Sequence, residues 1–301
     1  MGKRRYNVND DYFKKWSSNM AYVLGLWFAD GYIDSKKNIF SICQHKKDQY
    51  LLRMILQEMQ SACSLTSSGN TKVLKITSKK IVEDIVRLGG KPCKSLDVKF
   101  PSIPKKFLPD FIRGLWDGDG CISNQKWRGY NYYRASLSSG SKKFIYELKE
   151  VLNKNMPFTK GFVEKKNQKR GTIIKGRPLK KDSVVYQFNF GINDTRRLRD
   201  FMYYDESNFK MIRKYKKFQE AGAIKFTRPV IMWPYIKAKK HIHKEIITKF
   251  GINTKNKWLK YVKNNQRSKY IPADPFKTYK NTGWIDWYDW LGKDRPKSRT
   301  V

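Results

Sequence analysis

The chain has 301 residues, with 64 Lys and Arg against 26 Asp and Glu, a formal net charge of +38 and a hydrophobic fraction of 40%. This composition excludes a disordered or collagen-like chain, and the length allows two or three domains with separate cores. The sequence has no long apolar run and no targeting segment. We therefore expect no membrane association and an intracellular protein, either cytoplasmic in a bacterial or phage host or organellar.

The positive charge is interleaved with 18 Tyr, 17 Phe and 9 Trp, a pattern typical of surfaces that follow the phosphates of nucleic acids. The four cysteines form no CxxC pair, and only His241 and His243 among the three histidines lie close together. This spacing predicts neither a zinc site nor a disulfide framework.

The first predicted helix is the apolar stretch MAYVLGLWFADGYI, residues 20–33, which contains Gly25 and Ala29 four positions apart and ends at Asp30 and Gly31. Hydrophobic periodicity and helix-start signals predict the elements that follow it. These are a strand over 39–43, a helix over 47–59, a strand over 73–77 and a helix over 78–88.

A second copy of the helix follows at an offset of 89 residues, as FIRGLWDGDGCIS over residues 111–123. Gly114, Gly118 and Asp119 match Gly25, Ala29 and Asp30. The predicted order of elements repeats as well, with a strand over 133–137, a helix over 141–152, a strand over 184–190 and a helix over 194–203. This order predicts a duplicated α+β core.

The second copy also contains a basic segment, residues 160–181, that reads as a hairpin of a shape able to lie in a DNA groove. Its candidate DNA-binding residues are Lys165, Lys166, Lys169, Arg170, Lys175, Arg177, Lys180 and Lys181.

Small residues four positions apart form a flat stripe, so we expect the two repeat helices to pack closely and to bring Asp30 and Asp119 together at adjacent C-termini. Two carboxylates at the negative ends of two helix dipoles repel each other. A divalent cation between them removes the repulsion, and ligation by oxygen alone suits Mg²⁺. Such a site beside a basic surface is suited to hydrolysis of a phosphodiester.

Both segments resemble the signature helix of the LAGLIDADG homing endonucleases, as VLGLWFADG over residues 23–31 and IRGLWDGDG over 112–120. The resemblance implies an αββαββα unit repeated about a pseudo-twofold axis, with the first repeat over 1–107 and the second over 108–222. It implies a monomer of a mobile genetic element, active in intron homing, that cuts both strands of a long asymmetric double-stranded DNA site and leaves 3′ overhangs. Two or more Mg²⁺ ions would lie at the motif interface.

The resemblance also implies the site residues. Asp30 and Asp119 fall at the metal-binding positions, with Ala29 and Gly118 beside them in the metal site, whereas Asp117 matches Phe28 and is expected to be a structural or polar-contact residue. One lysine is expected near each centre, as Lys94 and as Lys214, which we favour over Lys210. Gln44 is expected beside the metal and water, and its counterpart in the second repeat lies near Ser139.

Residues 223–301 read as a separate module with five of the nine Trp and a net charge of +14. Part of this module, with tryptophans at 284, 287 and 290, resembles a small repeat unit of phage-type integrases. Tryptophans at this spacing form either a small core or a platform for stacked bases, and the core is the favoured interpretation.

The alternative function is that of a nucleic-acid binder that does not cut, such as an intron-splicing maturase on the same fold. Retention of both Asp30 and Asp119 favours the endonuclease.

Overall fold

The protein is described by a computed structural model in which residues 6–127, 130–156, 160–174, 177–205, 209–223, 232–264, 268 and 270–295 are placed. The chain divides into two compact units, residues 1–225 and 226–301. Among the described residues, no helix is both long and apolar enough to cross a bilayer.

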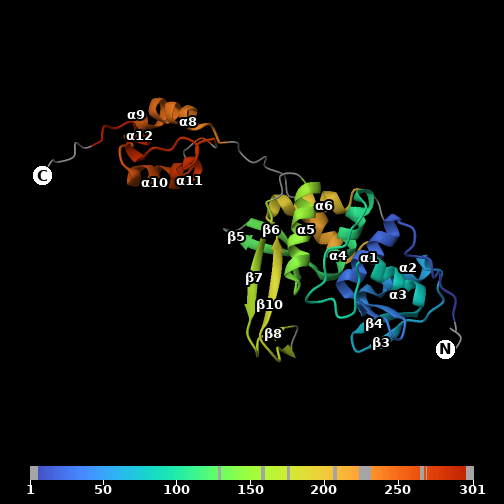
Figure 1. Ribbon diagram of the computed structural model, residues 1–301. Helices are drawn as coiled ribbons and strands as arrows, with labels where there is room; N and C mark the ends of the chain where they lie inside the picture. Colours follow the sequence, from blue (N-terminus) through green and yellow to red (C-terminus); the bar gives the residue numbers. More distant parts are fainter. Residues whose placement is uncertain are drawn as a thin grey trace. The chain divides into compact units, whose positions relative to one another are not determined.

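The first half of the larger unit alternates helices with antiparallel strands (Figure 1). Its elements are α1 (Ser18–Asp30), β1 (Gly31–Asp34), β2 (Ile39–His45), a 3₁₀ turn (Lys46–Asp48), α2 (Gln49–Glu58), β3 (Thr66–Ser68), β4 (Thr71–Thr77) and α3 (Lys79–Arg87). The strands form an antiparallel sheet in the order β1-β2-β4-β3.

The second half repeats this plan after a short 3₁₀ turn (Lys105–Phe107). Its elements are α4 (Leu108–Asp119), β5 (Gly120–Trp127), β6 (Tyr130–Ser139), α5 (Lys142–Asn155), β7 (Phe162–Gln168), β8 (Ile173–Ile174), β9 (Arg177–Pro178), β10 (Ser183–Asn189), α6 (Ile192–Met202) and α7 (Ile212–Ala223). Its four-stranded sheet has the order β5-β6-β10-β7, which is the order of the first sheet. The predicted duplicated α+β architecture is therefore confirmed.

The expected strands and helices all occur, and the structure adds strands that the pattern did not indicate. Strand β3 is the three-residue segment Thr66–Ser68, which is exposed throughout and has no hydrophobic alternation to reveal it. Strands β1 and β5 begin directly at the glycine that ends each repeat helix. Pairing with the neighbouring strand forms these elements, because their own residues carry little periodic signal.

Helices α1 and α4 pack side by side at the centre of the larger unit (Figure 1). A Cβ added at Gly25 would lie 2.0 Å from the main-chain oxygen of Phe111, and one added at Gly114 would lie 2.0 Å from that of Tyr22. Since Phe111 and Tyr22 are themselves 89 residues apart, the two contacts are related by the repeat. The backbones approach so closely that only hydrogen fits between them.

Gly31 and Gly120 end their helices without a left-handed turn. A glycine after a helix is commonly left-handed, whereas these have φ of −94° and −73° and continue directly into strands. A Cβ added at Gly31 would lie 2.1 Å from the indole of Trp27, and one at Gly120 would lie 2.2 Å from that of Trp116. The glycines therefore make room for two buried tryptophans.

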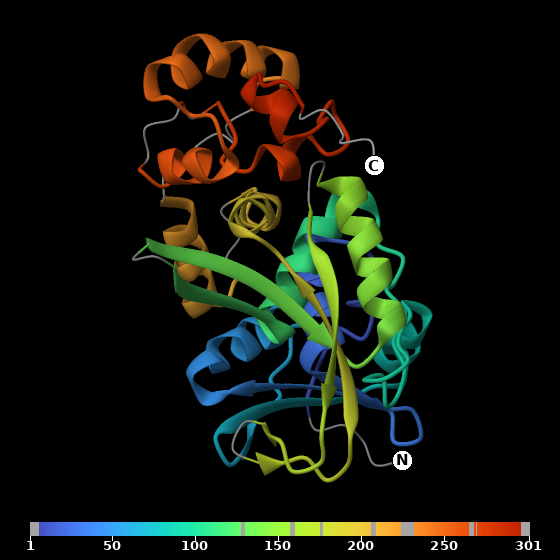
Figure 2. The same cartoon turned by 90° about the vertical axis from the view of Figure 1, so that its left-hand side faces the viewer.

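The β7–β10 hairpin runs on beyond the other strands of its sheet to a tip that carries β8 and β9 (Figure 2). Strand β10 pairs with β7 over seven residues, from Ser183 opposite Gln168 to Asn189 opposite Phe162. The predicted basic hairpin therefore exists as an extension of the second sheet, and the first sheet has only the short β3–β4 pair at the same place.

The smaller unit has its own helices and its own core. Its helical segments are α8 (Tyr235–Ile242), a π-helical turn (His243–Ile247), α9 (Thr248–Phe250), α10 (Lys255–Lys263), α11 (Pro275–Tyr279) and α12 (Trp287–Leu291). Trp258 and Trp290 are fully buried, and Trp284 and Trp287 pack against the same cluster. The closely spaced tryptophans thus belong to a small core.

We expect Gly114→Ala to lower the free energy of unfolding by about 1–3 kcal/mol or more, because the methyl group would overlap the carbonyl of Tyr22 and force the two helices apart. Thermal denaturation would show a lower melting temperature, by roughly 2–4 °C for each kcal/mol. Gly191→Ala is the matched control, since its Cβ would meet no atom within 4 Å. Equal melting of both variants would contradict the close packing.

Candidate active site

The candidate site lies where α1 and α4 end together. Asp30 is the last residue of α1, and Asp119 is the last residue of α4. A Cβ added at Gly118 would lie 3.0 Å from Oδ2 of Asp30, so the carboxylate of one helix lies against the backbone of the other. Both aspartates line one open pocket of about 340 Å³, together with Gly118, Gly120, Cys121, Ile122, Arg213, Lys214 and Lys217.

The first sheet places Gln44 beside Asp30. Residues Phe40 and Ile42 of β2 are buried, and Gln44 follows them on the same core-facing side at the end of the strand. Its side-chain amide donates a hydrogen bond of 2.7 Å to Oδ2 of Asp30. Gln44 is only 5% exposed, so this contact holds one carboxylate oxygen in a fixed direction.

The second sheet has a serine where the first has Gln44. Gly31 pairs with Ile42 in the first sheet, and Gly120 pairs with Leu137 in the second, so Ser139 takes the place of Gln44. The Ser139 hydroxyl instead accepts a hydrogen bond from the main-chain N–H of Ser141 at 3.1 Å, next to the start of α5. The surroundings of the two aspartates therefore differ.

Lys94 reaches the end of α1 from the linker that joins the repeats. Its ammonium donates to the main-chain oxygen of Gly31 at 2.5 Å and lies 3.5 Å from that of Ala29. Burial lowers the pKa of Lys94, whereas the charges of Asp119 and Asp30 act in the opposite direction. The cation is thus close enough to both carboxylates to sense their charge.

Lys214, on α7, likewise binds main-chain oxygens at the end of α4. Its ammonium donates to the main-chain oxygens of Trp116 at 2.9 Å, Asp117 at 2.6 Å and Gly118 at 3.0 Å. Burial lowers its pKa to about 8, against the opposing attraction of Asp117, Asp30 and Asp119. Each helix end, with its partial negative charge, is therefore capped by one buried lysine.

Asp117 makes structural contacts, and its position in the first repeat is taken by Phe28, which cannot be a metal ligand. Its Oδ2 accepts hydrogen bonds from the Tyr22 hydroxyl at 2.8 Å and from the N–H of Met211 at 2.7 Å. It is 1% exposed, and burial raises its pKa to about 6 despite the charge of Lys214 and these hydrogen bonds.

The segment before α7, which leads to Lys214, is tied to the first repeat. The Tyr50 hydroxyl accepts from the N–H of Ile212 at 2.7 Å and donates to the main-chain oxygen of Lys210 at 3.2 Å. Arg213 binds the buried carboxylate of Asp48 at 3.0 Å. Both first-repeat residues lie at the start of α2.

The linker that carries Lys94 is tied in turn to the second repeat. The Ser141 hydroxyl donates to the main-chain oxygen of Val98 at 2.7 Å, and the Glu147 carboxylate accepts from the N–H of Phe100 at 2.8 Å. Each lysine-bearing segment is therefore held by the other repeat, through residues of α2 and α5 and of their N-terminal caps.

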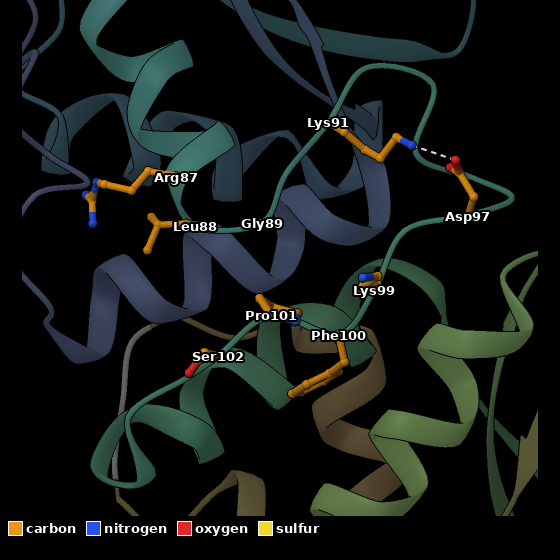
Figure 3. A pocket seen from close by; sticks show the side chains of 9 residues that line it. All are labelled: Arg87, Leu88, Gly89, Lys91, Asp97, Lys99, Phe100, Pro101 and Ser102. Atoms are coloured by element: carbon orange, nitrogen blue, oxygen red, sulfur yellow. Dashed lines mark hydrogen bonds and ion pairs between the residues drawn. The ribbon is translucent and has the colours of Figure 1, made fainter.

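The same linker lines a second pocket of about 430 Å³, shown in Figure 3. Its only lining carboxylate, Asp97, is bound by Lys91 at 2.5 Å across the loop, and Arg87 and Lys99 add further positive charge. Because it lacks a pair of carboxylates, this pocket does not share the chemistry of the site between α1 and α4.

The donor set at the helix ends fits a hard cation. The described residues contain no cluster of three or more His, Cys, Asp or Glu side chains, so the site offers two carboxylates and main-chain oxygens. Mg²⁺ is commonly bound through one or two carboxylates, with phosphate oxygens of the substrate and water completing its shell. Asp30 and Asp119 fit such a role.

The predicted DNA-binding residues lie on the hairpin, away from the core. Lys165, Lys166, Lys169, Arg170, Lys180 and Lys181 are all exposed. Glu164 and Asp182 each lie within 4 Å of one of these lysines. Arg177 belongs to β9, and Lys175 lies outside the described residues.

Two basic residues of the pocket were not predicted. Arg213 and Lys217 line it next to the aspartates, on the same helix as Lys214. In a chain with 64 Lys and Arg, their sequence neighbourhood does not distinguish them from other cations. Only Lys217, three positions after Lys214 on a helix, has a spacing that could have suggested a shared face.

Solved structures resemble the chain weakly. The LAGLIDADG meganuclease I-AabMI bound to uncleaved DNA is 15% identical with a TM-score of 0.45, and the match covers 77% of this chain and 98% of that one. I-LtrWI, a LAGLIDADG homing endonuclease bound to target DNA, is 15% identical with a TM-score of 0.44 over 88% of this chain and 100% of that one. I-GzeII in complex with a DNA target is 14% identical with a TM-score of 0.42 over 86% and 100%.

No curated protein sequence matches the chain significantly. A family model described as a LAGLIDADG-like domain matches residues 107–202. The match runs from the start of α4 to the end of α6 and includes Asp119. The family model therefore matches the part of the chain that forms the second repeat of the core.

Proposed function

We propose that the protein is a site-specific homing endonuclease that makes a metal-dependent double-strand break in DNA. The observation that carries this proposal is the repeat-related pair Asp30 and Asp119 at adjoining helix ends, each end capped by a buried lysine. A carboxylate pair that served only packing would not need to face an open pocket lined by Arg213 and Lys217.

In this proposal Asp30 and Asp119 hold Mg²⁺ ions, with the main chain of Ala29 and Gly118 beside them. Bound Mg²⁺ supplies activation of water and stabilisation of the charge on the phosphate oxygens during in-line displacement. Gln44 orients Asp30, and Lys94 and Lys214 place positive charge next to the scissile phosphates. Because Ser139 replaces Gln44 in the second half, the two centres are unequal.

The DNA lies along the exposed faces of the two sheets. Alternation along the strands turns Ser41 and Lys75 outward in the first sheet, and Arg134 and Gln187 outward in the second, opposite to the buried positions. Such side chains bond to base edges in the major groove. Since the two faces carry different residues and only the second has the long basic hairpin, we expect a long asymmetric site bound by a monomer.

Residues 226–301 add affinity and not chemistry in this proposal. The unit is basic and has a core of its own. Of its carboxylates, Asp286 at the start of α12 is bound by Arg295, and Asp289 in the same helix is bound by Lys239. They are therefore paired with cations and are not arranged as metal ligands.

We expect Asp30→Asn or Asp119→Asn to reduce double-strand cleavage by about a hundred-fold or more with Mg²⁺, because each substitution removes a charged metal ligand worth several kcal/mol in the transition state. DNA binding should persist, since neither residue contacts phosphate directly. Cleavage and gel-shift assays on a duplex that joins the sequences flanking the gene measure both. Ca²⁺ in place of Mg²⁺ should allow binding without cutting, because its coordination is looser.

Normal cutting by either variant would contradict the site. Tight binding of the wild-type chain to this duplex without nicking of either strand would instead favour the non-cutting binder. Asp34→Asn provides the control, because Asp34 ends strand β1 and does not line the pocket.

A chain that ends at Lys225 should still cut, with weaker binding and a flatter salt dependence. Each lost phosphate contact removes about 0.9 from the slope of log K against log[salt]. The truncation keeps α7 intact, whose Ala221 carbonyl accepts a hydrogen bond from Arg196 at 2.9 Å. Binding measured from low to moderate salt, with footprints of both chains, decides the question. An unchanged slope and footprint would show that the smaller unit does not touch DNA.

A further inference from the structure

Helix α4 carries a buried polar stripe that helix α1 lacks. Asp110, Arg113 and Asp117 lie at spacings of three and four along one side of α4, and all three are at most 1% exposed. Their counterparts 89 residues earlier are Ala21, Leu24 and Phe28, which are apolar and also buried. The repeat is thus symmetric in its glycines and aspartates but not in this stripe.

Arg113 fastens the chain between α6 and α7. Its guanidinium donates to the main-chain oxygens of Met202 at 2.6 Å and Phe209 at 2.9 Å, and to the carboxylate of Asp110 at 2.7 Å. Asp110 in turn accepts from the Tyr204 hydroxyl at 3.1 Å. Both ends of the described connection are therefore held by one side chain of α4.

Asp117 fixes the next point of the chain. It accepts the N–H of Met211, and Met211 accepts the N–H of Lys214 at 3.0 Å in the first turn of α7. The ammonium of Lys214 then returns to α4 and bonds to three carbonyls at its end. The contacts thus run from Asp117 of α4 through Met211 to Lys214 of α7, and from Lys214 back to the end of α4.

Lys94 is placed by other means. Its linker is held by Ser141, the N-cap of α5, and by Glu147 of the same helix. The equivalent side of α1 is filled by Phe28, which packs against Phe111 and Phe144. No residue of α1 at the repeat-equivalent positions can form a hydrogen bond through its side chain.

Polar residues are not required for packing at these positions, because the equivalent positions of α1 are buried and apolar. Burying polar and charged groups costs free energy unless every one is paired, and apolar residues of similar size are commonly as stable or more so. On other elements the stripe contacts Ser18 and Tyr22 of α1 and several groups on the path that leads to Lys214, which are those of Met202, Tyr204, Phe209 and Met211.

We propose that Asp110, Arg113 and Asp117 position Lys214, so that cleavage of one DNA strand depends on this stripe and cleavage of the other does not. The inference rests on the proposed endonuclease function and makes Asp117 and Arg113 positioning residues. The two strands would be cut by centres built differently, and loss of the stripe would convert the enzyme into one that nicks.

The test measures the rates at which the two strands are cut, with a different label on each strand of the duplex described above. Asp117→Leu removes the oxygen that accepts from both Tyr22 and Met211, whereas Asp117→Asn keeps an oxygen for the N–H of Met211. We expect Asp117→Leu to slow one strand by about 10- to 100-fold, the magnitude typical of lost orienting contacts. The slowed strand should be the one slowed by Lys214→Met, and Asp117→Asn should restore most of the rate.

The double variant of Asp117→Leu with Lys214→Met should be no slower than Lys214→Met alone, because both changes act through one group. Leu148→Ala is the control for general destabilisation, since Leu148 is fully buried on α5 of the same repeat and is not part of the stripe. It should leave the ratio of the two strand rates unchanged. Equal slowing of both strands, additive effects in the double variant, or the same ratio change in Leu148→Ala would each overturn the proposal.

A second measurement does not depend on cutting. Acetylation of lysines by an N-hydroxysuccinimide ester, followed by mass spectrometry, should be slow at Lys214 in the wild-type chain and several-fold faster in Asp117→Leu, with Lys94 unchanged as the internal reference. If the wild-type chain does not cut, the proposed function fails while this measurement still decides the positioning role. Unchanged acetylation of Lys214 would overturn that role.

Discussion

The structure depends on the backbone contact between α1 and α4. Gly25 and Gly114 let each helix approach the carbonyl of the other to a distance that no side chain permits. The contact fixes where both helices end, and hence where Asp30 and Asp119 lie. It is made twice, through residues 89 positions apart, so the duplication of the sequence becomes an approximate symmetry of the site. The sheets, the flanking helices and the lysine segments are arranged around this pair.

Electrostatics then accounts for what surrounds the pair. Two carboxylates at two helix C-termini concentrate negative charge. Lys94 and Lys214 offset this charge, because their ammonium groups bond to main-chain carbonyls at the ends of the two helices. Burial lowers the pKa of both lysines, and the nearby aspartates act against that shift. The lysines are further held across the repeat boundary, Lys214 through Asp48 and Tyr50. A change in how the halves pack would therefore displace aspartates and lysines together.

The halves also differ in ways that matter for function. Gln44 holds Asp30 in the first half, and Ser139 takes the position of Gln44 in the second. The second half alone has the long basic hairpin and the polar stripe of α4. A duplicated chain is free to diverge in this way, because a change at one position no longer alters both halves as it would in a symmetric dimer. Divergence on the sheet faces suits an asymmetric DNA site, and divergence behind the lysines suits unequal centres.

The sequence by itself determined the duplication and the order of the main helices and strands. It also determined the close packing of the glycine stripes and the proximity of Asp30 and Asp119. These features follow from local periodicity and from one exact offset of 89 residues. It did not indicate β3, the reason for Gly31 and Gly120, or the roles of Arg113 and Arg213. Strand β3 exists through its neighbour, the two glycines face tryptophans one turn back, and the arginines act through main-chain oxygens and a carboxylate far along the chain. Such contacts depend on which distant segments the tertiary structure brings together. Local sequence patterns do not indicate them, because lysine and arginine occur throughout the chain.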